Sequence, residues 1–342
     1  MRPNLLRTVR RIVPPVAGGV LLTGFILVTL ADIGKDKKAS TADSTQKRSE
    51  KINGADGGTK LSRVSIRPIG DWAVDPAETQ ELNAIYAAMN QAASAVQPGP
   101  DAGFQRRAIE AESAVELESF LTKHTNSAYG PDLRLTLARL YRLRSAYAAA
   151  MNHYQLAWDV VKGSPDPTAD QMAREAAGGL ATMLALTGRM NELDALEVEA
   201  KSLINGGPGG MEWGWAKEMR TWARKYPTEA YKCGLYCLDQ LGWLTQPGQF
   251  VPKDIVETAS SPNGFTAADL VRIGTKAGLR VRAALLTSPT NIPVPCVMHL
   301  DSEHFVMLSE KRGAFYCVYD TIAPGQKWLT ASEIAREASG CV

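Results

Sequence analysis

Cys233 is the residue of this sequence whose surroundings best suit covalent chemistry. It lies within Tyr226–Gly242, where Pro227 and Gly234 flank it and leucines then recur at helical spacing, at positions 235, 238 and 241. This pattern places the cysteine at the N-terminus of a helix, where free backbone N–H groups favour the thiolate and lower the pKa of a thiol. Because the thiolate is the nucleophilic form, the segment predicts a reactive thiol.

The sequence that follows this helix has the alternation of β-strands. Four strands are predicted, with a hairpin turn at Gly313 between the last two, at residues 279–286, 294–300, 304–308 and 314–319. His304 begins the third strand, and Asp320 follows the fourth. An imidazole beside a thiol can remove its proton, and a carboxylate can hold that imidazole in place. The pattern therefore predicts Cys233 as nucleophile, His304 as base and Asp320 as the residue that orients the base.

These segments resemble the C39 family of peptidases, which process bacteriocins at double-glycine sites. The likeness covers residues 211–342 and is carried by Lys232–Leu235, Gly264–Leu270, Gly278–Leu279, His304–Leu308, Val318–Asp320 and Glu337–Gly340. It implies a papain-like α+β cysteine peptidase domain in which Cys233, His304 and Asp320 are catalytic. It also implies a peptide or protein substrate, cleavage after Gly-Gly, and no metal or organic cofactor.

Two positions depart from the family pattern. Pro227 stands where the family places the glutamine of the oxyanion hole, and Thr321 replaces the proline that usually follows the orienting aspartate. Loss of one oxyanion donor typically lowers the rate by about 10²–10³. The activity is therefore in question, and a catalytically inactive, peptidase-fold interaction module remains the alternative function.

The cysteines and histidines of this region allow other roles. Cys233 could belong to a structural disulfide, and Cys233, Cys237, His299 and His304 together could bind zinc. His299 is also a rival for the role of base. The remaining thiols that lie in predicted core segments are those of Cys237, Cys296 and Cys317.

Residues 67–204 have the pattern of an all-α region. Apolar residues return at intervals of three and four, and Pro/Gly clusters break the pattern into helices. One stretch has the offsets of a tetratricopeptide repeat, at Leu137, Ala138, Tyr141, Tyr147, Ala150, Tyr154 and Ala157. An irregular helical bundle is the alternative. A groove in such repeats could hold a protein partner.

A glycine-rich segment, Asn205–Gly210, separates this region from residues 211–342 and predicts a linker. The bond between Gly210 and Met211 follows a Gly-Gly pair, so self-cleavage there is one hypothesis and a simple hinge is the other.

The N-terminus predicts a membrane anchor. Residues 12–31 carry no charge and are long enough to span a bilayer, and four arginines precede them, at positions 2, 7, 10 and 11. Residues 1–34 are therefore predicted as a cytoplasmic tail and transmembrane helix, and the polar residues 35–66 as a flexible linker. The bulk of the chain is then expected on the outer side of a bacterial membrane. A cleaved signal peptide is the alternative.

Together these parts predict a multi-domain protein, similar in its order of domains to large bacterial surface proteins that continue into Rhs-type repeats. The formal net charge is only +2, so no nucleic acid is expected as a partner.

Overall fold

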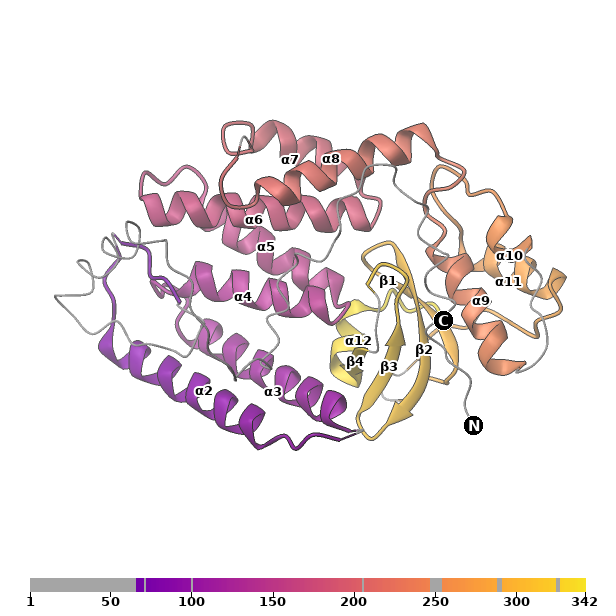
Figure 1. Cartoon of the computed structure of the whole chain (residues 1–342), viewed down its shortest axis with the longest axis horizontal. Helices are drawn as coiled ribbons and strands as arrows, with labels where there is room; N and C mark the ends of the chain where they lie inside the picture. Colours follow the sequence, from indigo (N-terminus) through magenta and orange to yellow (C-terminus); the bar gives the residue numbers. More distant parts are fainter. Residues whose placement is uncertain are drawn as a thin grey trace, which may run out of the picture. The chain divides into compact units, whose positions relative to one another are not determined.

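The structure, a computed structural model, describes residues 66–70, 72–99, 101–204, 206–246, 254–287, 291–323 and 327–342. All of them belong to one compact unit, Gly58–Val342. A helical region comes first, and a small antiparallel sheet follows near the C-terminus, as expected for an α+β domain (Figure 1). The predicted membrane span, residues 12–31, lies outside the described residues. Within the described ranges, none of the helices is both long and apolar enough to cross a bilayer.

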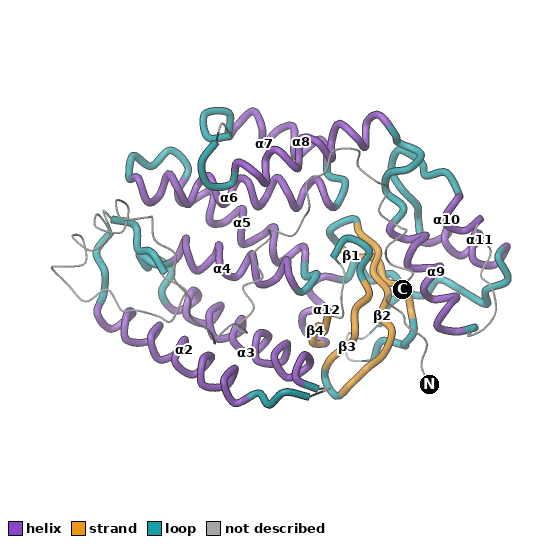
Figure 2. The backbone as a smooth tube through the Cα atoms, viewed as in Figure 1, coloured by secondary structure: helices purple, strands orange, loops and turns teal. Residues whose placement is uncertain are grey.

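The helical region is drawn in purple on the left and at the top of Figure 2. Its helices are α2 (Pro76–Ala95), α3 (Ala102–Lys123), α4 (Gly130–Leu143), α5 (Tyr147–Val161), α6 (Pro167–Leu186), α7 (Met190–Glu199) and α8 (Gly210–Lys225). Aspartates cap α2 and α6, and a proline follows each cap at the first helical position. Both residues suit a helix start, because the side chain accepts a free N–H and the proline needs no partner for its nitrogen.

Helices α4, α5 and α6 pack closely because small residues line their contacts. Ala138, Ala150 and Ala157 are fully buried. Gly179 of α6 lies so near Tyr154 that a Cβ at this glycine would sit 2.3 Å from the tyrosine ring. The three alanines and Tyr154 belong to the predicted repeat pattern, whereas Gly179 does not. That the helices form tetratricopeptide repeats stays a prediction.

The glycine-rich segment before α8 is a packed turn. Gly209 has φ +78° and lies against Gly178 of α6, where a Cβ would come within 2.7 Å of its carbonyl oxygen. The Gly210–Met211 peptide bond belongs to the first turn of α8. Its backbone is therefore helical, whereas a protease active site binds extended chain. This packing does not agree with a loose hinge, and self-cleavage at Gly210–Met211 would require the first turn of α8 to unwind.

The sheet contains β1 (Cys296–Leu300), β2 (His304–Arg312), β3 (Phe315–Tyr319) and β4 (Lys327–Thr330), in that order and all antiparallel. The prediction of a strand at 279–286 is wrong. This segment belongs to none of the strands of the sheet and is joined to the chain's described C-terminal residues by an isolated bridge, from Leu285 to Cys341. β4 was not predicted. The remaining helices are α9 (Cys233–Thr245), α10 (Asp254–Glu257), α11 (Ala267–Lys276) and α12 (Ala331–Glu337).

The two faces of the sheet belong to two different hydrophobic cores. Val306 and Leu308 of β2 join a large core that is continuous with the helical region. Phe305 and Met307, which point to the other face, join a smaller core with α9 and α11. The helical region therefore covers one face of the sheet, while α9–α11 lie on its other side (Figure 1).

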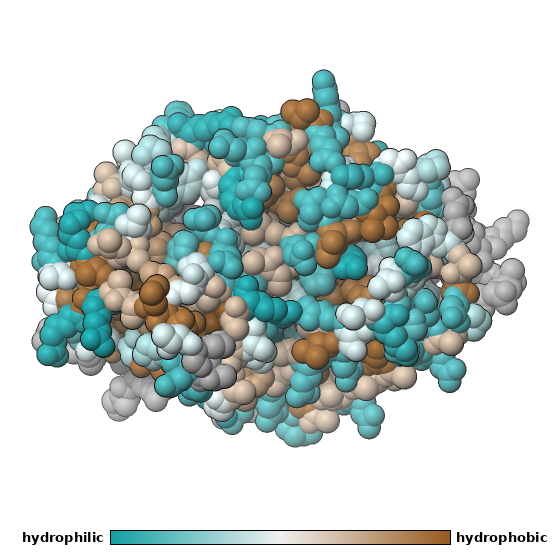
Figure 3. All heavy atoms as spheres, turned by 180° about the vertical axis from the view of Figure 1, so that it is seen from behind, coloured by the Kyte–Doolittle hydropathy of each residue, from teal (hydrophilic) through white to brown (hydrophobic). Residues whose placement is uncertain are grey.

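The surface seen from behind is a mixture of hydrophilic and hydrophobic patches (Figure 3). Large exposed hydrophobic side chains are spread over several elements, among them Trp72, Val115, Leu143, Val198, Met211 and Leu285. Scattered exposure of this kind is ordinary for folded domains.

Candidate active site

Cys233 is the first residue of α9, as the leucine spacing predicted. Gly234 follows it in close contact with Leu270 and Phe305, so that a Cβ at this glycine would sit 2.8 Å from Leu270 Cδ1. Only glycine fits there without displacing the core beneath the thiol. The thiol is half-buried.

His304 and Asp320 lie on neighbouring strands. β2 and β3 pair Met307 with Tyr319, so Asp320, one residue further, lies diagonally across from His304 on the same face. The imidazole Nε2 is 3.0 Å from Asp320 Oδ1, and both side chains are almost completely buried. Because Nε2 is held in this way, Nδ1 is the nitrogen left to bind the Cys233 thiol.

The electrostatics of Cys233 and His304 favour an ion pair. Burial raises the pKa of the Cys233 thiol, but the charge of His304, a hydrogen bond from it, and backbone N–H groups of Phe305 and Gly234 together lower the pKa below its usual value. Burial lowers the pKa of His304, but the charges of Cys233 and Asp320 and their hydrogen bonds raise it to about 10. Both shifts favour the pair of thiolate and imidazolium over the neutral pair of thiol and imidazole.

Asp320 stays ionised in spite of its burial. Burial raises its pKa, but the positive charge of His304 and hydrogen bonds from His304, Ser145 and Tyr147 lower it strongly. Its Oδ1 also accepts the backbone N–H of Ile322 at 2.9 Å. The carboxylate can therefore orient the imidazole and keep it protonated.

The other candidate ligands and bases lie elsewhere. His299 Nδ1 bonds Ser339 Oγ at 2.9 Å, with Glu303 as its acidic neighbour. The Cys237 thiol is buried and donates to the carbonyl of Phe305 at 3.4 Å. All five cysteines are free thiols, and among the described residues no group of three or more His, Cys, Asp or Glu side chains is arranged to bind a metal.

The sequence did not predict that the helical region contributes to this site. Ser145 Oγ donates to Asp320 Oδ2 at 2.6 Å, and the Tyr147 hydroxyl donates to the same oxygen. Tyr147 was interpreted only as a packing residue of the repeat. No local pattern signals this contact, because the partners are more than 170 positions apart.

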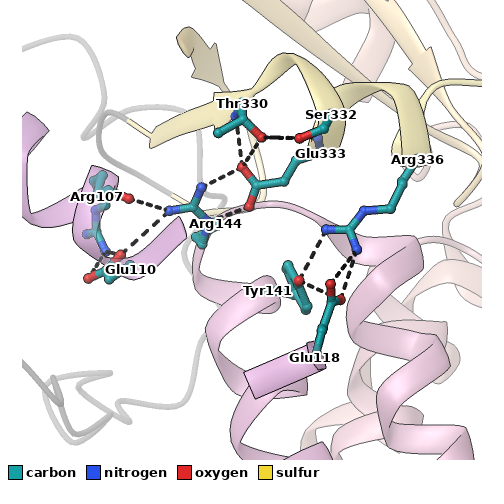
Figure 4. A network of polar contacts seen from close by, with 9 residues as sticks. All are labelled: Arg107, Glu110, Glu118, Tyr141, Arg144, Thr330, Ser332, Glu333 and Arg336. Atoms are coloured by element: carbon teal, nitrogen blue, oxygen red, sulfur yellow. Dashed lines mark hydrogen bonds and ion pairs between the residues drawn. The ribbon is translucent and has the colours of Figure 1, made fainter. Parts of the chain in front are cut away.

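Helix α12, which follows β4, fixes helices α3 and α4 to the sheet (Figure 4). The buried guanidinium of Arg144 bonds both oxygens of Glu333, at 3.0 and 2.6 Å, and Arg107 O at 2.8 Å. Arg336 binds Glu118 and the hydroxyl of Tyr141. Two carboxylates and two guanidinium groups thus join α12 to α3 and α4.

Glu337, the last residue of α12, caps helix α5. Its carboxylate accepts the N–H groups of Ala148 and Ala149 at 2.8 and 2.9 Å. Burial raises the pKa of this carboxyl to about 7, although the two N–H groups and Arg336 act in the opposite direction. The charged form is thus the costly one in the folded protein.

This shift predicts a pH dependence of stability. The pKa of Glu337 is near 4.5 in the unfolded state, so the folded state binds this proton more tightly. The free energy of unfolding should therefore fall as pH rises from 4.5 to 7. The contribution is at most about 3 kcal/mol. Urea unfolding of Glu337→Gln at several pH values should show a smaller fall than the wild type. Glu116→Gln, at an exposed glutamate of α3, is the control and should follow the wild type; an unaltered slope in Glu337→Gln would contradict the assignment.

The comparison with protein families bears on this geometry. Residues 225–342 match the model of the Peptidase C39 family. This C39 domain contains Cys233, His304 and Asp320, and begins at the end of α8. The match supports a cysteine peptidase-like hydrolase. Neither a curated protein nor a solved structure matches the chain.

The match confirms the resemblance for the C-terminal domain. Tetratricopeptide repeats and an association with Rhs repeats remain predictions. The helices that cover one face of the sheet and reach Asp320 precede residue 225, so they lie outside the matched C39 domain.

Proposed function

We propose that this chain is a cysteine peptidase in which Cys233, His304 and Asp320 are the catalytic residues. The observation that carries the proposal is the position of His304, which bonds Asp320 through Nε2 at 3.0 Å and lies near enough to Cys233 for its charge to lower the pKa of the thiol. A thiol with a lowered pKa at a helix N-terminus, paired with an oriented imidazole, is the arrangement needed for nucleophilic attack on a carbonyl.

The reaction follows from these groups. The Cys233 thiolate attacks the carbonyl carbon of the scissile bond, and the oxygen takes the negative charge. His304 then gives its proton to the leaving amine as the C–N bond breaks, which leaves a thioester on Cys233. His304 next takes a proton from water, the resulting hydroxide adds to the thioester, and collapse releases the carboxyl product with the thiolate restored.

The oxyanion needs donors that Pro227 cannot supply. The N–H groups of the first turn of α9 have no partner within the helix and lie beside the thiol, so they are the natural donors. Cleavage after Gly-Gly is proposed from the family resemblance alone. We further propose that residues 12–31 anchor the enzyme in a bacterial membrane with the peptidase outside.

An inactive interaction module is the second candidate function, and the absent glutamine at position 227 favours it. The two functions differ in what they require of Cys233, because an interaction module without catalysis does not need a thiol with a lowered pKa. The lowered pKa of the Cys233 thiol and its contact with His304 support the enzyme over the module.

A thiol probe and a peptide library test the proposal. Full-length protein in detergent should be labelled at Cys233 by an activity-based thiol probe at neutral pH, and should cleave Gly-Gly peptides. Cys233→Ala should lose both properties, a fall in cleavage of at least about 10⁴-fold. Cys341→Ala, which removes another half-buried thiol, is the control and should behave as the wild type. Labelling or cleavage that survives Cys233→Ala would reject the proposal.

A further inference from the structure

We propose that Ser145 and Tyr147, in the turn between α4 and α5, are positioning residues of this active site. The helical region is then a part of the catalytic unit, outside the C39 domain. This inference rests on the proposed function, because it assigns the turn a role in orienting Asp320 and, through it, His304.

The two carboxylate oxygens of Asp320 have different hydrogen-bond partners. Oδ1 binds His304 Nε2 and the N–H of Ile322, both within the C39 domain. Oδ2 binds only the hydroxyls of Ser145 and Tyr147 among the contacts of the described residues. The Asp320 side chain has no exposed surface, so solvent cannot take the place of these donors. A buried carboxylate oxygen without donors is costly and free to rotate.

The backbone conformation at Ser145 is unfavourable for a residue with a side chain, which indicates that the serine hydroxyl has a role. Ser145 has φ +64°, and Ala146 N donates to Tyr141 O, which closes α4 as a Schellman turn. Glycine suits the left-handed position best, because other residues pay about 1 kcal/mol for it.

Two other turns of the same chain use glycine at this place. Gly188, with φ +78°, closes α6, and Gly278, with φ +86°, closes α11; in both, the next residue donates to the carbonyl five positions back. Serine replaces glycine only in the turn that faces Asp320, among these three. The bond from its Oγ to Asp320 accounts for the unfavourable backbone conformation.

Tyr147 contacts both partners of the pair that it supports. Its hydroxyl binds Asp320, and its ring lies against the imidazole of His304 with 5.6 Å between ring centres. The side chain is 1% exposed. The tyrosine therefore limits rotation of the carboxylate through a hydrogen bond and rotation of the imidazole through van der Waals contact.

The turn is itself held to the C39 domain on both sides. Arg144, which precedes Ser145, forms the buried pair with Glu333. Ala148 and Ala149, which follow Tyr147, donate to Glu337. Residues 144–149 are thus fixed to the same domain that carries the catalytic pair, so the two hydroxyls have a defined position relative to Asp320.

Substitutions of the two hydroxyls test the proposal in the full-length protein. Ser145→Gly removes the hydroxyl but relieves the backbone, so the relief should offset part of the stability that the lost hydrogen bond provided. Tyr147→Phe removes only an oxygen. Tyr154→Phe, two helical turns along α5 from Tyr147, is the matched control. We expect kcat to fall about 10-fold in each of the first two variants with KM unchanged, and neither constant to change in Tyr154→Phe.

The pH profile of Cys233 alkylation by iodoacetamide separates positioning from a change in charge. If the hydroxyls position Asp320, their loss weakens its hold on His304, and the acid limb of the profile moves to higher pH. If the hydroxyls only reduce the negative charge that Asp320 presents to His304, their loss increases that charge. The acid limb of the profile then moves to lower pH. A shift to lower pH, or none, would overturn the proposal.

A double-mutant cycle completes the test. In an Asp320→Ala background, Ser145→Gly and Tyr147→Phe should cause no further loss of kcat or change in the alkylation profile, since the residue through which they act is gone. Equal losses in both backgrounds would show a merely structural role. The alkylation profile needs no substrate, so a wild type that cleaves none of the peptides would reject the peptidase proposal and still leave the positioning role decided.

Discussion

Replacement of His304 by alanine is expected to lower the alkylation rate of Cys233 at about pH 6.5 by at least about 100-fold. The imidazolium is the charge that holds the pKa of the Cys233 thiol below its usual value, so the variant should contain mostly thiol at this pH. In the wild type the rate should be nearly constant up to the pKa of His304, about 10. In the variant it should rise about tenfold per pH unit instead.

Peptide cleavage should fall still further, by at least about 10³-fold, because the leaving amine also loses its proton donor. His304→Gln keeps more of the side-chain volume and guards against loss of folding, which thermal unfolding would reveal. His299→Ala is the control, since this histidine bonds Ser339 and was the rival candidate for the base. A flat pH profile in both His304 variants, or a loss of cleavage in His299→Ala as large as theirs, would contradict the assignment of the base.

Arg144→Met is expected to lower the free energy of unfolding by about 3–5 kcal/mol. Arg144 is 1% exposed and pairs with Glu333, whose side chain is 6% exposed. Removal of the guanidinium leaves a buried carboxylate with only the cap of α12, the N–H and hydroxyl of Thr330, as donors. Urea unfolding followed by circular dichroism would measure the loss.

Two further variants make this result specific. Arg144→Met combined with Glu333→Met should regain most of the loss, because a buried ion pair and an apolar pair of similar volume differ little in stability. Asp101→Asn removes an ion pair between the same two regions, to Arg312, but one in which both side chains are about half exposed, at 52% and 47%. It should cost at most about 1 kcal/mol. A loss in Arg144→Met no larger than in Asp101→Asn would show that the buried pair does not stabilise the contact.

Local patterns in the sequence predicted the elements that carry Cys233, His304 and Asp320. The leucine spacing located α9 and its first residue, and the alternating strands placed a histidine and an aspartate on adjacent strands. These predictions depend on neighbours within a few residues, which periodicity reports well. Cys233, His304 and Asp320, which the sequence grouped as one site, lie together in the structure.

Pairing over long distances was not predictable in the same way. Arg144 and Glu333 are 189 positions apart, and each alone is an ordinary charged residue of a helix. Tyr147 fits a helix-packing pattern whether or not its hydroxyl has a partner. The prediction of a strand at 279–286 failed because a hydrophobic pattern does not show which partners a segment finds. Among the described residues, this segment pairs only with residues 340–342.

The order of these segments along the chain determines when the proposed active site can be completed during synthesis. A polypeptide is made from its N-terminus, so α4 and α5 leave the ribosome long before Asp320 and α12, and can fold first. Helix α12, which docks on Arg144 and on the start of α5, emerges after both Cys233 and His304. A nascent chain that already contains Cys233 and His304 therefore lacks the anchored carboxylate. We expect the proposed active site to be complete only after α12 has emerged, which limits damage by shorter nascent chains.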